Sequence, residues 1–371
     1  MKDARLIERQ KTELTRLREM VRVLQRQQGM SFESVIKEFK TFLAEEEKHS
    51  IKFTPRVYPK LALKAKKQVF DRDHSEVATL VLSDWHGSET VRPEESNGIN
   101  RFNSKVLSNR VFAVVDKFKR IVRGHQTMYN VEKIWLPILG DMIHGSIHPE
   151  NILTNDLLDV PAAILVARLL IMAVSDLKSL GLPIEADCTV GNHPRLLAKM
   201  PVKRQAHMSL DWIIYTMLED FFKNDPQVKV TVHTGQFAVV DQLGHRVVLE
   251  HGYGASGERD MKERIRAMFD SPVYRKATGL EGSSVDYVVI GDKHQAKDGE
   301  GYMVNGCLSG SNELGVAWRL APIGAIQQMF GISKRQVPTW HYPLDVSDVQ
   351  SEKPENDYSK YTNAFMREHG R

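Results

Sequence analysis

Cysteine is scarce in this sequence. The 371 residues include only Cys188 and Cys307, which is too few for a disulfide framework and too widely spaced for a short zinc-binding pair. The cysteine count therefore favours a reducing compartment, and we expect a cytoplasmic protein.

Long apolar runs and an N-terminal leader are also missing. The longest apolar stretch covers residues 160–174 and is interrupted by Arg168, so it is shorter than the roughly 20 residues that a membrane span needs. We interpret it as a buried helix. Charged residues begin at Lys2, which argues against a secretory signal peptide. No membrane partner is expected.

An excess of charge of one sign occurs only near the N-terminus. Residues 1–30 contain eight basic and four acidic side chains, which accounts for the whole net charge of +4. A basic arm of this kind can bind nucleic acid or another polyanion. A solvated helix face explains the same charges, and the sequence does not separate the two readings.

The same arm carries a heptad pattern. Ile7, Leu14 and Val21 recur every seven residues, with Leu17 and Leu24 at the matching second position, which predicts a coiled coil of about three heptads. We expect residues 1–50 to form an N-terminal helical arm and residues 51–76 a basic linker. The arm can form a homodimer through the coil, or pack as a helical hairpin on the main domain.

Residues 77–346 have the texture of one large α/β (α+β) domain. The strands are expected at 77–83, 133–139, 184–190, 227–233, 236–241, 245–250, 285–290 and 302–308, and the helices at about 103–124, 155–180, 208–223 and 258–270. This alternation predicts a mixed sheet or a pair of sheets flanked by helices. Residues 347–371 are interpreted as a polar and loosely packed C-terminal tail.

Five of the expected strands end in residue types that bind metals. The five segments are Asp84-Trp85-His86, Gly140-Asp141, Gly191-Asn192-His193, His251-Gly252 and Gly291-Asp292-Lys293-His294. Ligands in α/β proteins gather outside the carboxyl ends of the strands. We therefore expect these five segments to converge on one site.

The donor types select a chemistry. Carboxylate, amide and imidazole donors without a thiolate favour Mn²⁺, Fe or Zn²⁺ with open coordination positions, and Mg²⁺ is also compatible. Two such ions about 3.5–4 Å apart can hold the attacking and leaving oxygens of a phosphoryl displacement. The pattern therefore predicts two divalent metal ions, with manganese preferred.

The order of these segments resembles the calcineurin-like metallophosphoesterases. Within that family it is nearest to phage and bacterial phosphoesterases and to the double-strand-break repair nucleases, and the resemblance spans residues 77–345. It implies a four-layer fold, in which two mixed β-sheets are sandwiched between helices. It is also compatible with a phage-encoded protein in a bacterial host.

The resemblance also implies a role for each site residue. Asp84, His86 and His294 resemble ligands of the first metal, Asn192 and His251 resemble ligands of the second, and Asp141 resembles the bridging carboxylate. His193 is similar to the histidine that protonates the leaving oxygen. The nucleophile is then a water activated by the metals.

Two positions depart from the family pattern. Asp292 stands where the family usually has a histidine; it can bind the second metal with an altered preference, or the second metal can bind weakly. Pro194 replaces a residue that is commonly acidic. Arg195, two residues after His193, is predicted to hold a phosphate.

Three functions are compatible with these residues. The first is a nuclease that cleaves DNA or RNA, favoured by the basic arm and by two basic segments, 195–204 and 259–266, which can form a cationic rim or simply solvated faces. The second is a phosphatase or a phosphodiesterase for cyclic nucleotides or other small molecules. The third is a non-catalytic metal-binding scaffold. His144 and His148 can contact substrate or stabilise their loop.

Overall fold

The computed structural model describes residues 75–253, 285–317, 319 and 321–371. All of these belong to one compact unit, Pro55–Arg371. The predicted helical arm (1–50), nearly all of the basic linker (51–76) and the helix expected at 258–270 lie outside the described residues. The predictions made for those segments therefore stay predictions.

The first β-sheet has six strands in the order β11-β10-β1-β2-β3-β4. They are β1 (Ser75–Leu80), β2 (Asn130–Ile138), β3 (Ile184–Cys188), β4 (Val228–Val232), β10 (Ile326–Ser333) and β11 (His341–Asp345). Strands β1 to β4 are parallel neighbours, whereas β10 pairs antiparallel with both β1 and β11. The carboxyl ends of β1, β2 and β3 therefore lie along one edge of this sheet.

The second β-sheet has five strands in the order β5-β6-β7-β9-β8. They are β5 (Phe237–Gln242), β6 (His245–Glu250), β7 (Tyr287–Ile290), β8 (Lys297–Gly299) and β9 (Tyr302–Val304). Strands β6, β7 and β9 are parallel, and the edge strands β5 and β8 are antiparallel to their neighbours. Both sheets are therefore mixed, as the sequence predicted.

The two sheets pack face to face. Trp135 and Phe330 from the first sheet belong to the same buried cluster as Leu249 and Tyr287 from the second. Each large apolar side chain that is fully buried in such a layer stabilises the fold by about 1.5–3 kcal/mol. This shared core fixes the strand ends of one sheet relative to those of the other.

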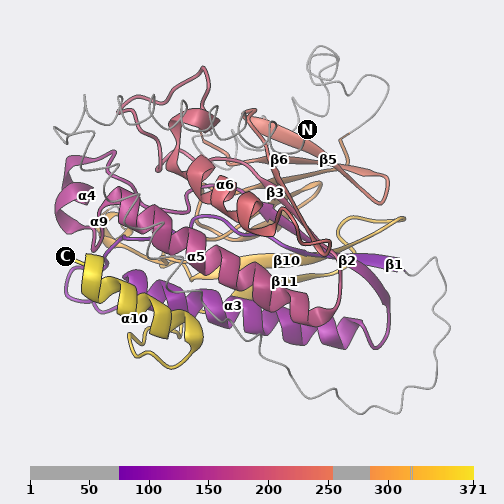
Figure 1. Cartoon of the computed structure of the whole chain (residues 1–371), viewed down its shortest axis with the longest axis horizontal. Helices are drawn as coiled ribbons and strands as arrows, with labels where there is room; N and C mark the ends of the chain where they lie inside the picture. Colours follow the sequence, from indigo (N-terminus) through magenta and orange to yellow (C-terminus); the bar gives the residue numbers. More distant parts are fainter. Residues whose placement is uncertain (1–74, 254–284, 318, 320) are drawn as a thin grey trace. The chain divides into compact units, whose positions relative to one another are not determined.

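Helices cover the outer face of the first sheet. They are α3 (Ser104–His125), α5 (Asp159–Leu177) and α6 (Leu210–Phe222), and α10 (Asp357–His369) packs on α3 and α5. The short helices α4 (Pro149–Thr154), η2 (Lys178–Leu180), η3 (Ala206–Met208) and α9 (Glu313–Ala317) lie in the connections between the longer elements. Helices α3, α5 and α10 contact one another and run side by side in front of the sheet in Figure 1. The expected pair of mixed sheets flanked by helices is confirmed.

One helix in the described part of the chain is long and apolar enough to cross a membrane by length and composition. It spans Asp159–Leu180, and 72% of its most apolar window is buried inside the protein. Such burial is typical of a core helix, so the interpretation of this run as a buried helix is confirmed. The helix is longer than the apolar run because polar residues extend it at both ends.

The prediction of a loosely packed C-terminal tail was wrong. Helix α10 begins with a capping box between Asn356 and Ser359, and Tyr358 and Phe365 are buried on α3 and α5. Arg110 of α3 also donates to the carbonyl oxygen of Val349 at 2.9 Å. The segment looks polar in sequence because only one narrow stripe of the helix faces the core.

Candidate metal centre

The five expected ligand segments follow five neighbouring strand ends. Asp84 and His86 follow β1, Asp141 follows β2, Asn192 and His193 follow β3, His251 follows β6, and Asp292 and His294 follow β7. Asp84, His86, Asp141, Asn192 and His251 are buried. The predicted convergence is therefore present in the fold, whereas the binding of metal by these residues stays a prediction.

Most of these residues have an unusual backbone conformation. Five of the seven predicted metal ligands have positive φ angles: Asp84 (53°), His86 (47°), Asp141 (53°), Asp292 (63°) and His294 (57°). Residues other than glycine rarely adopt this left-handed region, which costs of order 1–3 kcal/mol each and is concentrated at functional sites. The chain therefore turns sharply after β1, β2 and β7, where these five residues lie.

A first group of donors contains Asp84, His86 and His294, whose ligand atoms lie within 4.8 Å of one another. The Nε2 atoms of His86 and His294 are 3.0 Å apart, and His294 Nε2 is 3.6 Å from Asp84 Oδ1. Two imidazole nitrogens bound to one ion at about 2.1 Å lie roughly 3.0–3.4 Å from each other, depending on the angle between them. This group fits a divalent ion.

A second group contains Asp84, Asp141 and His251. His251 Nε2 lies 3.1 Å from Asp141 Oδ2 and 2.9 Å from Asn192 Oδ1. On the other side of the ring, His251 Nδ1 donates to the carbonyl oxygen of Leu139 at 2.6 Å. Nε2 therefore faces two oxygen acceptors: it donates an N–H to them when the ring is protonated, and it can share a cation with them when the ring is neutral.

Asp292 lies at the edge of this second group. Its Oδ1 is 3.6 Å from His251 Nε2, its Oδ2 is 2.5 Å from Lys293 Nζ, and its backbone N–H donates to Asp84 Oδ1 at 3.1 Å. Oδ1 therefore faces the ligand atoms of the second group, while Oδ2 is paired with Lys293. Its predicted role as a metal ligand stays a prediction.

The buried carboxylates and His251 shift one another's pKa. Burial raises the pKa of Asp84 to about 6. Burial acts in the same direction on Asp141, but His251 and His193 beside it hold the pKa of that carboxyl well below its usual range. Burial lowers the pKa of His251, yet Asp141 and Asp84 outweigh this and raise it well above its usual value. The carboxylates of Asp84 and Asp141 thus favour a positive charge at the position of His251.

A buried polar chain supports Asp84 from behind, and the sequence did not reveal it. Ser83 Oγ donates to Asp84 Oδ2, Asn305 Nδ2 donates to Ser83 Oγ at 2.9 Å, and Gln327 Nε2 donates to the Ser83 carbonyl oxygen at 3.1 Å. Such partners orient a ligand and are as important to a metal site as the ligand itself. Only the adjacency of Ser83 to Asp84 was visible in the sequence.

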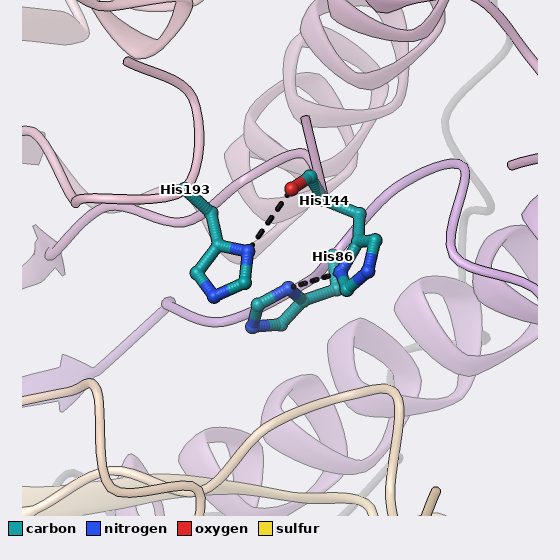
Figure 2. Close-up of side chains that lie close together, drawn as sticks. All are labelled: His86, His144 and His193. Carbon is teal, nitrogen blue, oxygen red and sulfur yellow. Dashed lines mark hydrogen bonds between the residues drawn. The ribbon is translucent and has the colours of Figure 1, made fainter. Parts of the chain in front are cut away.

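Three histidines form a cluster beside the first donor group (Figure 2). His86 Nδ1 and His144 Nδ1 are 3.1 Å apart, and His193 Nδ1 donates to the carbonyl oxygen of His144 at 3.0 Å. The rings of His86 and His193 are 4.8 Å apart between centroids. His144 thus contacts both neighbours, and burial lowers its pKa. The sequence pointed to His144 but left open whether it contacts substrate or its loop.

His193 is fixed at two points. Besides the bond from Nδ1, its backbone N–H donates to Asp141 Oδ1 at 2.8 Å. The His148 ring lies 6.4 Å from the His193 ring between centroids. The predicted proton donor therefore stands next to the predicted bridging carboxylate, with its Nε2 not used by either of these two bonds.

The guanidinium of Arg195 makes contacts that the sequence did not predict. It donates from Nη1 to the carbonyl oxygen of Asn192 at 2.7 Å, and from Nε and Nη2 to those of Leu197 and Ala198, each at 3.0 Å. Arg195 therefore stabilises the loop that carries Asn192 and His193. The predicted phosphate contact stays a prediction.

Of the two basic segments, 195–204 and 259–266, the structure describes the first. Lys199, Lys203 and Arg204, which follow the Asn192 loop, are exposed. The second basic segment, 259–266, lies outside the described residues. A cationic rim therefore has only one described part.

Comparisons with known proteins give the following. No protein-family model matches the sequence, and no curated protein matches it. The structure is similar to wild-type Vps29 from Entamoeba histolytica complexed with Zn²⁺, with 10% identity, a TM-score of 0.27, and coverage of 72% of this chain and 98% of that one. It is also similar to a conserved protein of Streptococcus pneumoniae named a predicted phosphoesterase, with 9% identity, a TM-score of 0.26, and coverage of 73% and 98%. Similarity at this level carries no argument about the chemistry of the site.

Proposed function

We propose that this chain is a dinuclear, metal-dependent phosphoesterase that hydrolyses phosphodiester bonds, with DNA or RNA as its substrate. The observation that carries the proposal is the arrangement around His251. Its Nε2 faces Asp141 Oδ2 at 3.1 Å and Asn192 Oδ1 at 2.9 Å, while its Nδ1 is committed to Leu139. Donors that point at one another in this way are suited to a shared cation.

In this proposal, each of two ions is held by its own group of residues. Asp84, His86 and His294 would hold the first ion, and Asn192, His251 and Asp292 the second, with Asp141 between them. All these donors are oxygen or imidazole nitrogen, which favours Mn²⁺ and also accepts Fe, Zn²⁺ or Mg²⁺. When bound, such ions supply Lewis acidity to a phosphate oxygen and to the attacking water.

The protein itself supplies the proton for the leaving oxygen. His193 Nδ1 donates to the His144 carbonyl oxygen, and the backbone N–H of His193 is tied to Asp141. These bonds fix the ring, so that Nε2 is the nitrogen that can transfer a proton. Imidazole is the side chain most often used for such proton transfers.

Charge favours a polyanionic substrate over a small phosphomonoester. Lys199, Lys203 and Arg204 are exposed on the segment that follows His193, and residues 1–30 carry the net positive charge of the chain. Basic side chains in such positions bind the phosphate backbone of nucleic acid without regard to its sequence. A homodimer formed through the N-terminal coil would bring two such arms together.

The proposal is tested by hydrolysis assays on the full chain. The protein is stripped of metal, supplied with Mn²⁺, Mg²⁺ or Zn²⁺, and offered single- and double-stranded DNA, RNA, a cyclic nucleotide, a simple diester and a phosphomonoester. We expect Mn²⁺-dependent cleavage of nucleic acid and of the diester. Cleavage of the monoester or the cyclic nucleotide alone would support the phosphatase or small-molecule phosphodiesterase, and no cleavage with any metal would support a scaffold.

Two variants control this assay. Asp141→Asn removes one charge at the centre of the site and should abolish hydrolysis. Asp220→Asn makes the same chemical change on the exposed surface of α6, where the carboxylate pairs with Lys223, and should leave activity unchanged. Equal activity of the two variants would refute the dinuclear assignment.

A further inference from the structure

Asp211 is a buried carboxylate with an uncommon set of partners. It lies in the first turn of α6 and has no exposed surface. Its Oδ2 accepts the backbone N–H groups of Asp141 at 3.0 Å and Gly191 at 2.9 Å, and its Oδ1 accepts that of Met142 at 3.2 Å. One side chain thus binds the two loops that follow β2 and β3.

These two loops are in direct contact. A Cβ atom on Gly191 would lie 2.1 Å from Asp141 Oδ1, and a Cβ atom on Gly140 would lie 2.1 Å from the backbone nitrogen of Gly191. Only glycine permits this approach. The N–H groups on the back of the loops are buried there, and unpaired buried N–H groups are costly, so the carboxylate of Asp211 satisfies three donors at once.

The carboxylate of Asp211 is not needed to cap its own helix. Ser209 is the N-cap of α6, and its Oγ accepts the backbone N–H of Asp211 at 3.2 Å. All three hydrogen bonds to the Asp211 side chain come from outside the helix. Helix α6 itself contacts α5 and β4. Asp211 therefore links a firmly packed helix to the loops that carry Asp141 and Asn192.

We propose that Asp211 is a positioning residue for the second metal ion. By holding the loops of Asp141 and Asn192 together, it sets the spacing between Asp141 Oδ2, Asn192 Oδ1 and His251 Nε2. It acts on His193 as well, because the backbone N–H of His193 donates to Asp141 Oδ1. The inference rests on the proposed metal centre and is independent of which phosphate ester is the substrate.

The first donor group is supported by other residues. Asp84 is held by Ser83, which is held in turn by Asn305. The loop of Asp84 and His86 is linked to Asp211 only indirectly, through backbone N–H groups that donate to the carbonyl oxygens of residues 140–142. Loss of Asp211 should therefore weaken the second ion more than the first. This difference separates positioning from a general loss of stability, which would weaken both ions equally.

The experiment is a titration of metal-free full chain with Mn²⁺, followed by electron paramagnetic resonance and calorimetry. Asp211→Ala removes all three hydrogen bonds. Asp211→Asn keeps one acceptor oxygen but directs an NH₂ group toward a backbone donor. Asp176→Asn is the matched control, since Asp176 is equally buried and pairs with Lys119 of α3 in a layer that provides no ligand.

We expect two bound Mn²⁺ ions in the wild type and in Asp176→Asn. In Asp211→Ala, one ion should bind about 10–100-fold more weakly while the other loses clearly less affinity, and Asp211→Asn should show the same difference to a smaller degree. Amide hydrogen exchange of the segments around Asp141 and Gly191 should become faster in both Asp211 variants, with or without metal. If Asp211→Ala does not fold, Asp211→Asn carries the same test.

Three outcomes would overturn the inference. Unchanged affinity for both ions in a folded Asp211 variant would show that the hydrogen bonds of Asp211 have no effect on metal binding. Equal weakening of both ions would reduce Asp211 to a general structural role. A wild type that binds no Mn²⁺ would remove the metal centre and the inference with it. By contrast, a wild type that binds two ions but cleaves no ester would contradict only the proposed activity.

Discussion

His251 and Asn192 face each other across the site at 2.9 Å, measured from the ring Nε2 to the side-chain Oδ1. They come from different sheets, since His251 follows β6 and Asn192 follows β3. The contact therefore depends on the packing of one sheet against the other. In the proposed metal centre, this contact lies where the second ion would bind.

Replacing His251 should weaken one of the two ions. His251→Gln keeps a polar side chain but removes the nitrogen that faces Asp141 and Asn192, so we expect a loss of about 10–100-fold in affinity for the second ion. Calorimetric titration with Mn²⁺ measures this directly. His233→Gln is the control, because His233 bonds Asp187 on β3 outside the site; equal affinities in the two variants would contradict the ligand assignment.

The role of His193 predicts a dependence on the leaving group. His193→Gln should lower kcat about 10²–10⁴-fold for a nucleic acid, whose leaving oxygen needs a proton. The loss should be much smaller for a nitrophenyl diester, whose leaving group departs as an anion. Comparison of kcat for the two substrates measures the difference. An equal loss on both would place His193 in binding or structure instead of proton transfer.

The contact between the loops that follow β2 and β3 predicts opposite effects for two glycine-to-alanine substitutions. Gly191→Ala places a Cβ atom 2.1 Å from Asp141 Oδ1, whereas Gly124→Ala in α3 meets nothing within 4 Å. We expect Gly191→Ala to lose activity and metal binding, and Gly124→Ala to gain about 0.5–1 kcal/mol of stability because alanine favours the helix. Urea unfolding and Mn²⁺ titration of both variants check this, and full metal binding by Gly191→Ala would contradict it.

Asp156 predicts a pH dependence of stability away from the metal ligands. Its carboxylate accepts the Ser104 N–H at 2.8 Å and the Ser104 hydroxyl at 2.7 Å, and burial raises its pKa from 3.8 to about 6. The folded state thus binds the proton more tightly than the unfolded state. The contribution of Asp156 to the free energy of unfolding is largest below about pH 4, falls as the pH rises to about 6, and is constant above that.

Asp156→Asn should remove this dependence. The amide remains neutral and can still accept from the Ser104 N–H, so the variant should gain about 1–2 kcal/mol over the wild type at pH 7.5 compared with pH 4.5. Urea unfolding of both proteins at the two pH values gives the difference. A difference between variant and wild type that does not change with pH would contradict the raised pKa.

The sequence predicted those parts of the fold whose pattern is local. Every expected strand within the described residues is present, because each is a run of β-branched and apolar residues. Strand β10 was missed although it lies beside β1 at the centre of the first sheet. Gln327 and Gln328 interrupt its apolar pattern. Both are buried because their side-chain amides donate to backbone carbonyl oxygens, those of Ser83 and Val304. Helix α10 was missed for a similar reason, since its buried stripe is narrow.

The candidate site was also predicted only in part from the sequence. The predicted ligands were visible because each follows directly after a strand in the sequence. The residues that hold them were not visible: Asn305 reaches Ser83 across 222 positions, and Asp211 reaches Asp141 across 70. Nothing local distinguishes an asparagine or an aspartate with such a partner from one on the surface, so only the fold reveals them.

The left-handed conformations of Asp84, His86, Asp141, Asp292 and His294 have a thermodynamic consequence. The cost of this backbone strain is part of the free energy of folding. A metal ion therefore meets ligand atoms that are already in place and need little ordering on binding. The metal-free protein should therefore stay folded, unlike a zinc finger. Metal should then raise the melting temperature gradually with its free concentration, as a ligand does when it binds a finished site.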